Sequence, residues 1–157
     1  MKKIIVSVVL SLMLLAVFAI PVAADDIPAS VTVNSFSSVT ITDNGDSGLL
    51  FGSQNPGTVK TPEAGSPSIT ITAASENNQT VTIVVSGVNF ADGGNSIPIA
   101  NAFWNASDNS GTATAMSTTP TTVGTLDAGQ SLNIYHWLTI PASQAAGDYT
   151  STFTYGS

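Results

Sequence analysis

The chain of 157 residues contains no cysteine, no arginine and only three lysines, and charged residues make up just 8% of it. The lack of cysteine excludes a disulfide framework, a thiolate zinc site, a cysteine nucleophile and a lipidated cysteine. Two of the lysines stand at positions 2 and 3, so the chain from Asp25 onward carries one base, Lys60, against ten acids. Because nucleic acids and anionic membrane surfaces bind clustered bases, we expect neither as a partner.

The N-terminal segment has the three parts of a secretory signal peptide. A basic start, Met1-Lys2-Lys3, precedes an apolar run over residues 4–20, and Val22-Ala23-Ala24 places small residues before an acidic pair. This pattern predicts that residues 1–24 form a signal helix cleaved after Ala24. Residues 25–157 are then expected outside the cell or on its surface, with no membrane attachment. A retained anchor is the alternative, because the apolar run is just long enough to span a bilayer.

After residue 24, apolar and polar side chains alternate with a period of two, as they do in half-buried strands. The alternation is strong over residues 31–41, 69–73, 81–85, 131–140 and 149–155, and weaker strand signals cover residues 48–52, 97–104, 112–116 and 121–126. Turn clusters rich in Asn, Asp and Gly separate these segments. No window after residue 20 shows helical periodicity. The sequence therefore predicts one all-β domain, a single antiparallel β-sandwich (Ig-like or jelly-roll-like) of about eight or nine strands.

The end of the chain carries a resemblance to known proteins. A strand ends at Pro141, and Ala146-Gly147-Asp148-Tyr149-Thr150 opens the last strand. This segment, residues 137–155, resembles the closing hairpin of secreted prokaryotic sandwich domains, and residues 51–57 and 96–101 are similar to segments of exported archaeal surface proteins. The resemblance implies a cell-surface sandwich and a subunit of a filament or pilus, as in fibres built by donor-strand complementation. It implies no catalytic residue.

These features predict a structural protein rather than an enzyme. Residues 25–36 form an extended arm that contains Pro28 and is rich in β-branched residues. Such an arm is suited to strand addition, in which it pairs with an open sheet edge of the next subunit and Ile27, Val31 and Val33 fill its pockets. Copies joined head to tail in this way make an open fibre. The expected partners are other copies of the chain or other cell-surface proteins.

The alternative function is a monomeric surface module that binds a glycan or calcium. Tyr135 and Trp137 share the strand face opposite the apolar side chains of residues 132–140, and Trp104 lies in the middle of the chain. Rings exposed side by side are able to stack on sugar faces. They are equally able to form core or subunit contacts, and that interpretation stays open.

Calcium is the one cofactor that the composition favours, because one histidine and no cysteine leave too few ligands for zinc or copper. Carboxylate ligands are offered by turn residues, namely Asp43, Asp46, Asp92 and Asp108. Their spacing lacks the alternating pattern of a calcium loop, and acids also cap ordinary turns.

The remaining polar motifs concern His136 and two sequons. His136 shares strand parity with Ile134 and Leu138, so we expect a buried histidine rather than a catalytic base. Candidate N-glycosylation sites are Asn78, in Asn78-Gln79-Thr80, and Asn105, in Asn105-Ala106-Ser107. Both lie in or next to segments predicted to be turns.

Overall fold

The structure, a computed structural model, describes residues 30–45, 48–65 and 67–157. The predicted signal peptide, residues 1–24, and Ile27 lie outside these ranges. The chain divides into two units between Val33 and Asn34, and every described strand belongs to the second unit. Within the described ranges, no helix has both the length and the apolar character needed to cross a membrane.

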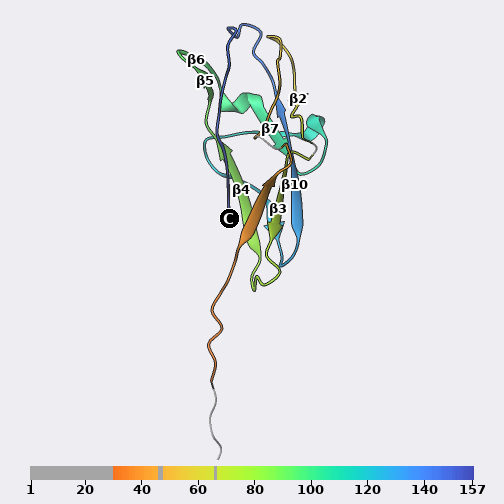
Figure 1. The fold of residues 1–157 in the computed structure, drawn as a ribbon, viewed down its shortest axis with the longest axis vertical. Coiled ribbons are helices and arrows are strands. Elements are labelled where there is room, and N and C mark those ends of the chain that lie inside the picture. The colour runs from red at the N-terminus through yellow and green to blue at the C-terminus, as the bar shows by residue number, and fades with distance from the viewer. Residues whose placement is uncertain (1–29, 46–47, 66) are drawn as a thin grey trace, which may run out of the picture. The chain divides into compact units, whose positions relative to one another are not determined.

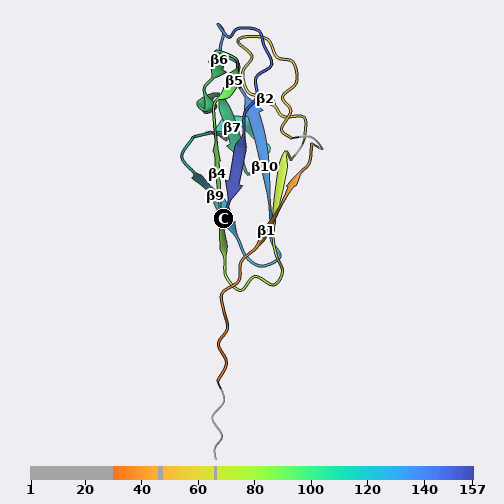
Figure 2. The same ribbon diagram turned by 60° about the vertical axis from the view of Figure 1, so that its left-hand side comes forward.

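The second unit is an all-β sandwich of antiparallel sheets, which confirms the predicted fold class (Figures 1 and 2). The larger sheet has the order β1 (Val39–Asp43), β3 (Ile69–Ala73), β10 (Ser131–Leu138), β7 (Ala102–Asn105) and β8 (Thr114–Ala115), and β2 (Thr61–Pro62) also pairs with β10. The smaller sheet has the order β11 (Phe153–Gly156), β4 (Val81–Gly87) and β9 (Thr121–Leu126). The unit also contains a separate hairpin of β5 (Phe90–Asp92) and β6 (Asn95–Ile97). Two short 3-10 helices, η1 (Ile99–Asn101) and η2 (Ser110–Thr112), complete the unit.

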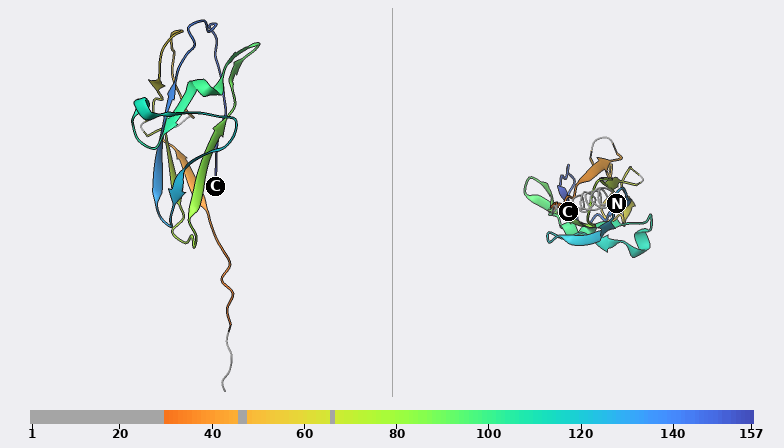
Figure 3. Two further views of the ribbon diagram at one scale, coloured as in Figure 1. Left: turned by 180° about the vertical axis from the view of Figure 1, so that it is seen from behind. Right: turned by 90° about the horizontal axis from the view of Figure 1, so that it is seen from below.

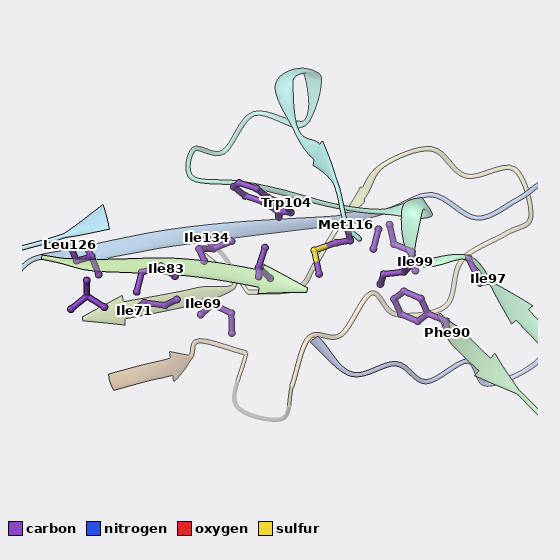
Figure 4. Close-up of a cluster of buried hydrophobic side chains, with 14 of the residues drawn as sticks. Ile69, Ile71, Ile83, Phe90, Ile97, Ile99, Trp104, Met116, Leu126 and Ile134 are labelled. Carbon is purple, nitrogen blue, oxygen red and sulfur yellow. The ribbon is translucent and has the colours of Figure 1, made fainter. Parts of the chain in front are cut away.

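The core lies between the two sheets and follows from the period-two alternation. Ile71 of β3, Ile83 of β4 and Ile134 of β10 are fully buried, and Figure 4 shows them within the same cluster. In β3 every second residue is buried, which places its threonines on the outer face. The apolar run of the sheet interior continues to Phe90, Ile97 and Ile99 at the other end of the cluster (Figure 4).

Strand β10 is the centre of the larger sheet. Its first half, residues 131–134, pairs with β3, and its second half, residues 135–138, pairs with β7. Side chains of Ile134, His136 and Leu138 are buried, as the strand parity predicts. Figure 3 shows the chain after η2 crossing from this sheet to β9 of the smaller one.

Several predicted strands differ from the observed ones. Residues 97–104 are not one strand, because the 3-10 helix η1 separates β6 from β7. Residues 30–38 contain no strand, and β1 begins only at Val39. Residues 48–52 form a loop, because Gly48 and Gly52 adopt positive φ angles of 91° and 64°, which end an extended strand. The last strand begins at Phe153 rather than Tyr149, after a single bridge between Ala91 and Thr150.

Candidate assembly site

The N-terminal arm has apolar side chains that the protein leaves in solvent. Val31 and Val33 are 88% and 78% exposed, and no strand includes them. Isolated apolar residues on a surface are ordinary, but two β-branched residues at alternate positions of a strandless segment match one face of an extended strand. Of the three predicted pocket-filling residues, the structure describes these two.

Each of the two sheets ends in edge strands, and β1 of the larger sheet and β11 of the smaller one are two of them. β1 pairs with β3 and β11 pairs with β4, and neither has a second strand partner among the residues that the structure describes. Each therefore presents backbone N–H and C=O groups along one free edge. Free edges of this kind are templates for pairing with another chain.

A large cleft with both apolar and polar side chains in its lining lies where these edges end. Its volume is about 990 Å³, and both edge strands contribute to its lining, with Asp43 from β1 and Phe153 from β11. Segments 48–56 and 144–152 line it as well, and Phe90, Leu138 and Ile140 add buried apolar surface. The cleft is large enough to take several side chains of an extended segment.

Three phenylalanines link the segments that line the cleft. Phe51 and Phe90 pack edge to face with ring centroids 6.3 Å apart, and Phe90 and Phe153 do the same at 5.9 Å. Such aromatic pairs add stability beyond the area that they bury. The strand pattern did not predict this group, because the three rings come from the loop 48–52, β5 and β11. The one signal in the sequence was the run of consecutive apolar residues between Gly48 and Gly52, which departs from the alternation of a half-buried strand.

Glu63 holds the loop that carries Leu50 and Phe51. Its side chain is buried, and its carboxylate accepts hydrogen bonds from the backbone N–H groups of Leu50 (3.2 Å) and Gly65 (2.7 Å). The next residue, Ala64, donates its N–H to the carbonyl of Leu50 at 3.0 Å. The backbone of Leu50 is thus bonded on both sides, while its side chain is half exposed and lines the cleft.

The predicted calcium ligands do not form one cluster. Within the described part of the chain, no group of three or more His, Asp or Glu side chains is arranged to hold a metal ion. Both carboxylate oxygens of Asp43 accept backbone N–H groups, from Gly45 at 2.9 Å and from Gly48 at 2.6 Å, which is turn capping. Asp92 lies in the β5–β6 hairpin and Asp108 beside a different cleft, whereas Asp46 lies outside the described residues. Calcium binding therefore stays a prediction.

The predicted sugar-stacking residues lie on two different faces. Trp104 pairs across the sheet with His136, so it points into the core and is not accessible to a sugar. Tyr135 and Trp137 stack on each other at 6.4 Å on the outer face, where Trp137 is only 4% exposed. They line a second cleft of about 440 Å³.

Lys60 stands at the rim of that second cleft in an unusual conformation. Its φ of 47° is the one positive value among the described residues other than glycine. The side chain lies over the Phe103 ring, 4.7 Å from the centroid, and Nζ donates to the carbonyl of Ser110. Its backbone N–H bonds to the hydroxyl of Thr139 at 3.0 Å, which helps to fix the conformation.

The two sequons differ in how their asparagines are bonded. The side-chain nitrogen of Asn105 donates to the carbonyl of Asn109 (3.0 Å) and to the hydroxyl of Thr112 (2.9 Å), so both of its hydrogens are used. The side-chain nitrogen of Asn78 makes one bond, to the carbonyl of Asn34 at 2.7 Å. Asn78 is exposed and Asn105 is partly buried. Glycosylation of either residue stays a prediction.

Burial shifts the pKa values of two side chains in the sandwich interior. It lowers the pKa of His136 to about 4. Burial, followed by the negative charges of Asp43 and Glu63, raises the pKa of Tyr155 above its ordinary value. Both shifts favour neutral side chains, so this polar pair is suited to a structural contact between the sheets.

Comparison of the sequence with protein families and with curated proteins identifies no relative. No protein-family model matches the chain, and no curated protein matches it in sequence. The features of this chain that point to a function are therefore the arm, the free edges and the cleft.

Proposed function

We propose that the protein is a secreted structural subunit of an extracellular filament or surface layer. Its N-terminal arm adds as a strand to the next copy of the same chain. The observation that carries this proposal is the cleft, lined in part by apolar side chains, at the ends of two free strand edges, β1 and β11. One copy thus has both an exposed apolar arm that can be donated and a free strand edge that can accept such an arm.

The dimensions of the arm fit this use. Residues 25–33, the mature chain before the second unit, would span about 30 Å when extended. In an extended segment Ile27, Val31 and Val33 project to the same side, because all three occupy odd positions. That side enters the cleft of the neighbour, while the backbone of the arm pairs with β1 or β11.

The contact is heterologous, because an arm on one copy meets a cleft on another. A chain of subunits then keeps an unused arm at one end and an unused cleft at the other, so growth does not stop by itself. This geometry produces a fibre rather than a closed dimer. The acidic, low-charge composition suits a surface component with no nucleic-acid or membrane partner.

Light scattering and negative-stain microscopy of residues 25–157 test the proposal. We expect mass to grow with concentration and fibres to be visible, and we expect both to disappear when residues 25–33 are deleted. The shortened protein should keep the melting temperature of the monomer, because residues 25–33 precede the sandwich. A full-length mature protein that stays monomeric at high concentration would overturn self-assembly.

A glycan-binding module is the second candidate, and one observation favours it. Tyr135, partly exposed, lines the second cleft together with the polar side chains of Lys60, Glu63 and Asp108. An aromatic ring beside polar groups is the usual composition of a sugar site. Binding to a panel of polysaccharides that is lost in Tyr135→Ala, with fibre formation unchanged, would support this function.

A further inference from the structure

Two neighbouring asparagines hold the segment that joins the arm to the sandwich. Residues 34–38 form no strand, yet five hydrogen bonds fix them to Asn77 and Asn78 in the turn between β3 and β4. We call these two asparagines the clip. Asn77 is buried and Asn78 is exposed.

The side chain of Asn77 bonds both polar groups of one residue. Its oxygen accepts the N–H of Ser38 at 2.8 Å, and its nitrogen donates to the carbonyl of Ser38 at 3.0 Å. A side-chain amide has one acceptor and a donor, like a peptide group. The backbone N–H of Ala74 donates to the same Ser38 carbonyl at 3.0 Å, so Asn77 reinforces the ladder one step beyond the pair Val39–Ala73.

Asn78 repeats this arrangement two residues closer to the arm. Its side-chain oxygen accepts the N–H of Phe36 at 2.8 Å, and its own N–H donates to the carbonyl of Phe36 at 3.2 Å. Its side-chain nitrogen reaches the carbonyl of Asn34 at 2.7 Å. The clip therefore extends the β1–β3 ladder as far as Asn34, where the second unit begins.

We propose that Asn77 and Asn78 are positioning residues for assembly, because they fix Asn34 as the point at which the arm leaves the sandwich. This inference rests on the proposed function. With the clip closed, the donated strand, which ends at Val33, is joined directly to the fixed segment that begins at Asn34. With the clip open, residues 34–37 become a link of four residues, because Ala74 still donates its N–H to the carbonyl of Ser38. A longer link lowers the effective concentration of the arm at the next cleft and loosens the spacing of copies along the fibre.

Asn78→Ala tests the clip in residues 25–157 made in a host without N-glycosylation, so that the sequon plays no part. Asn133→Ala is the matched control, because Asn133 is an exposed asparagine on β10 whose side chain bonds to Thr70 at 3.0 Å and touches no arm residue. We expect hydrogen exchange of the Phe36 amide, measured below the assembly concentration, to rise at least about tenfold in Asn78→Ala and to stay constant in the control. Asn78→Asp keeps the acceptor and loses the donor to Asn34, so we expect a smaller rise.

The second measurement is the growth rate and bending stiffness of the fibres. We expect Asn78→Ala fibres to grow more slowly and to bend more than those of the wild type and of Asn133→Ala. Unchanged exchange at Phe36, or faster exchange with fibres identical to the wild type, would overturn the positioning role. A wild type that forms no fibres would instead overturn the proposed function. The exchange result would then still decide whether Asn78 fixes the exit point of the arm.

Discussion

The imidazole Nε2 of His136 lies 3.1 Å from the phenol oxygen of Tyr155, and this hydrogen bond joins the two sheets across the core. His136 belongs to β10 of the larger sheet and Tyr155 to the edge strand β11 of the smaller one. The His136 ring also contacts Phe153, with centroids 5.5 Å apart. Phe153 and Tyr155 both line the larger cleft, so this contact helps to hold one of its sides.

The buried histidine predicts a loss of stability in acid. Its pKa is about 4 in the folded protein against an ordinary value of 6.5, so the unfolded chain binds the proton first as the pH falls. Above pH 6.5 the neutral histidine takes nothing from the free energy of unfolding. Between pH 6.5 and about 4 that free energy falls by up to about 1.4 kcal/mol per pH unit. Denaturant melts at several pH values measure this slope.

His136→Gln is the comparison for that experiment, because an amide keeps a polar group near Tyr155 and does not titrate in this range. Carboxylates add their own pH dependence to both proteins, so the quantity of interest is the difference between the two curves. We expect the wild type to lose about 3 kcal/mol more than the variant between pH 7 and pH 4. Parallel curves would show that His136 does not control the acid response.

Glu63→Ala is predicted to release the loop that lines the cleft. The substitution removes the acceptor for the N–H groups of Leu50 and Gly65 at a buried position, which costs about 3 kcal/mol. Glu76→Ala is the control, because Glu76 is exposed and accepts one bond, from the hydroxyl of Ser75. Chemical denaturation gives the stabilities, and an equal loss in the two variants would contradict the role of Glu63.

Gly87→Ala is predicted to destabilise the contact between β4 and β11. A Cβ at Gly87 would lie 2.8 Å from Ile99 Cδ1 and 3.1 Å from Phe153 Cδ1, so buried apolar groups must move. Overpacking of this kind costs about 1–3 kcal/mol. Gly94→Ala is the matched control, because nothing lies within 4 Å of its Cβ position. Thermal melts of both variants should separate them clearly, and equal melting temperatures would refute the packing argument.

Strands of the sandwich could be predicted from the sequence because the alternation of apolar and polar residues is a local pattern. In residues 69–73 and 121–126 the predicted ranges coincide with β3 and β9. Alternation fixes which side chains enter the core, as it does for His136. It says nothing about where a strand finds its partners, so it did not show that Trp104 lies opposite His136 on the core face.

The candidate site could be predicted only in part, because its two halves depend on different interactions. The arm is visible in the sequence as alternating apolar residues after the predicted cleavage site. The cleft is built by Phe51, Phe90 and Phe153, which are far apart in the chain and meet through tertiary packing. The clip looks like an ordinary polar turn until Asn77 and Asn78 are seen beside residues 34–38.

The arm and the cleft can be separated by two sets of charged substitutions. Val31→Asp with Val33→Asp places charges on the side of the arm that we propose enters the cleft, and burying them unpaired is strongly unfavourable. Leu50→Asp places a charge in the lining of the cleft, where the side chain is half exposed. We expect neither variant to form fibres alone.

A mixture of the two variants is the sharper test. The Leu50→Asp chain keeps a working arm and the double variant keeps a working cleft, so together they can form one joint and no more. We expect a one-to-one complex by light scattering, capped against further growth. Thr32→Asp, on the other side of the arm, and Val59→Asp, 72% exposed and outside the cleft lining, are the controls and should still form fibres. If the mixture stays monomeric while the controls form fibres, the arm does not enter this cleft, and the copies must join through another surface.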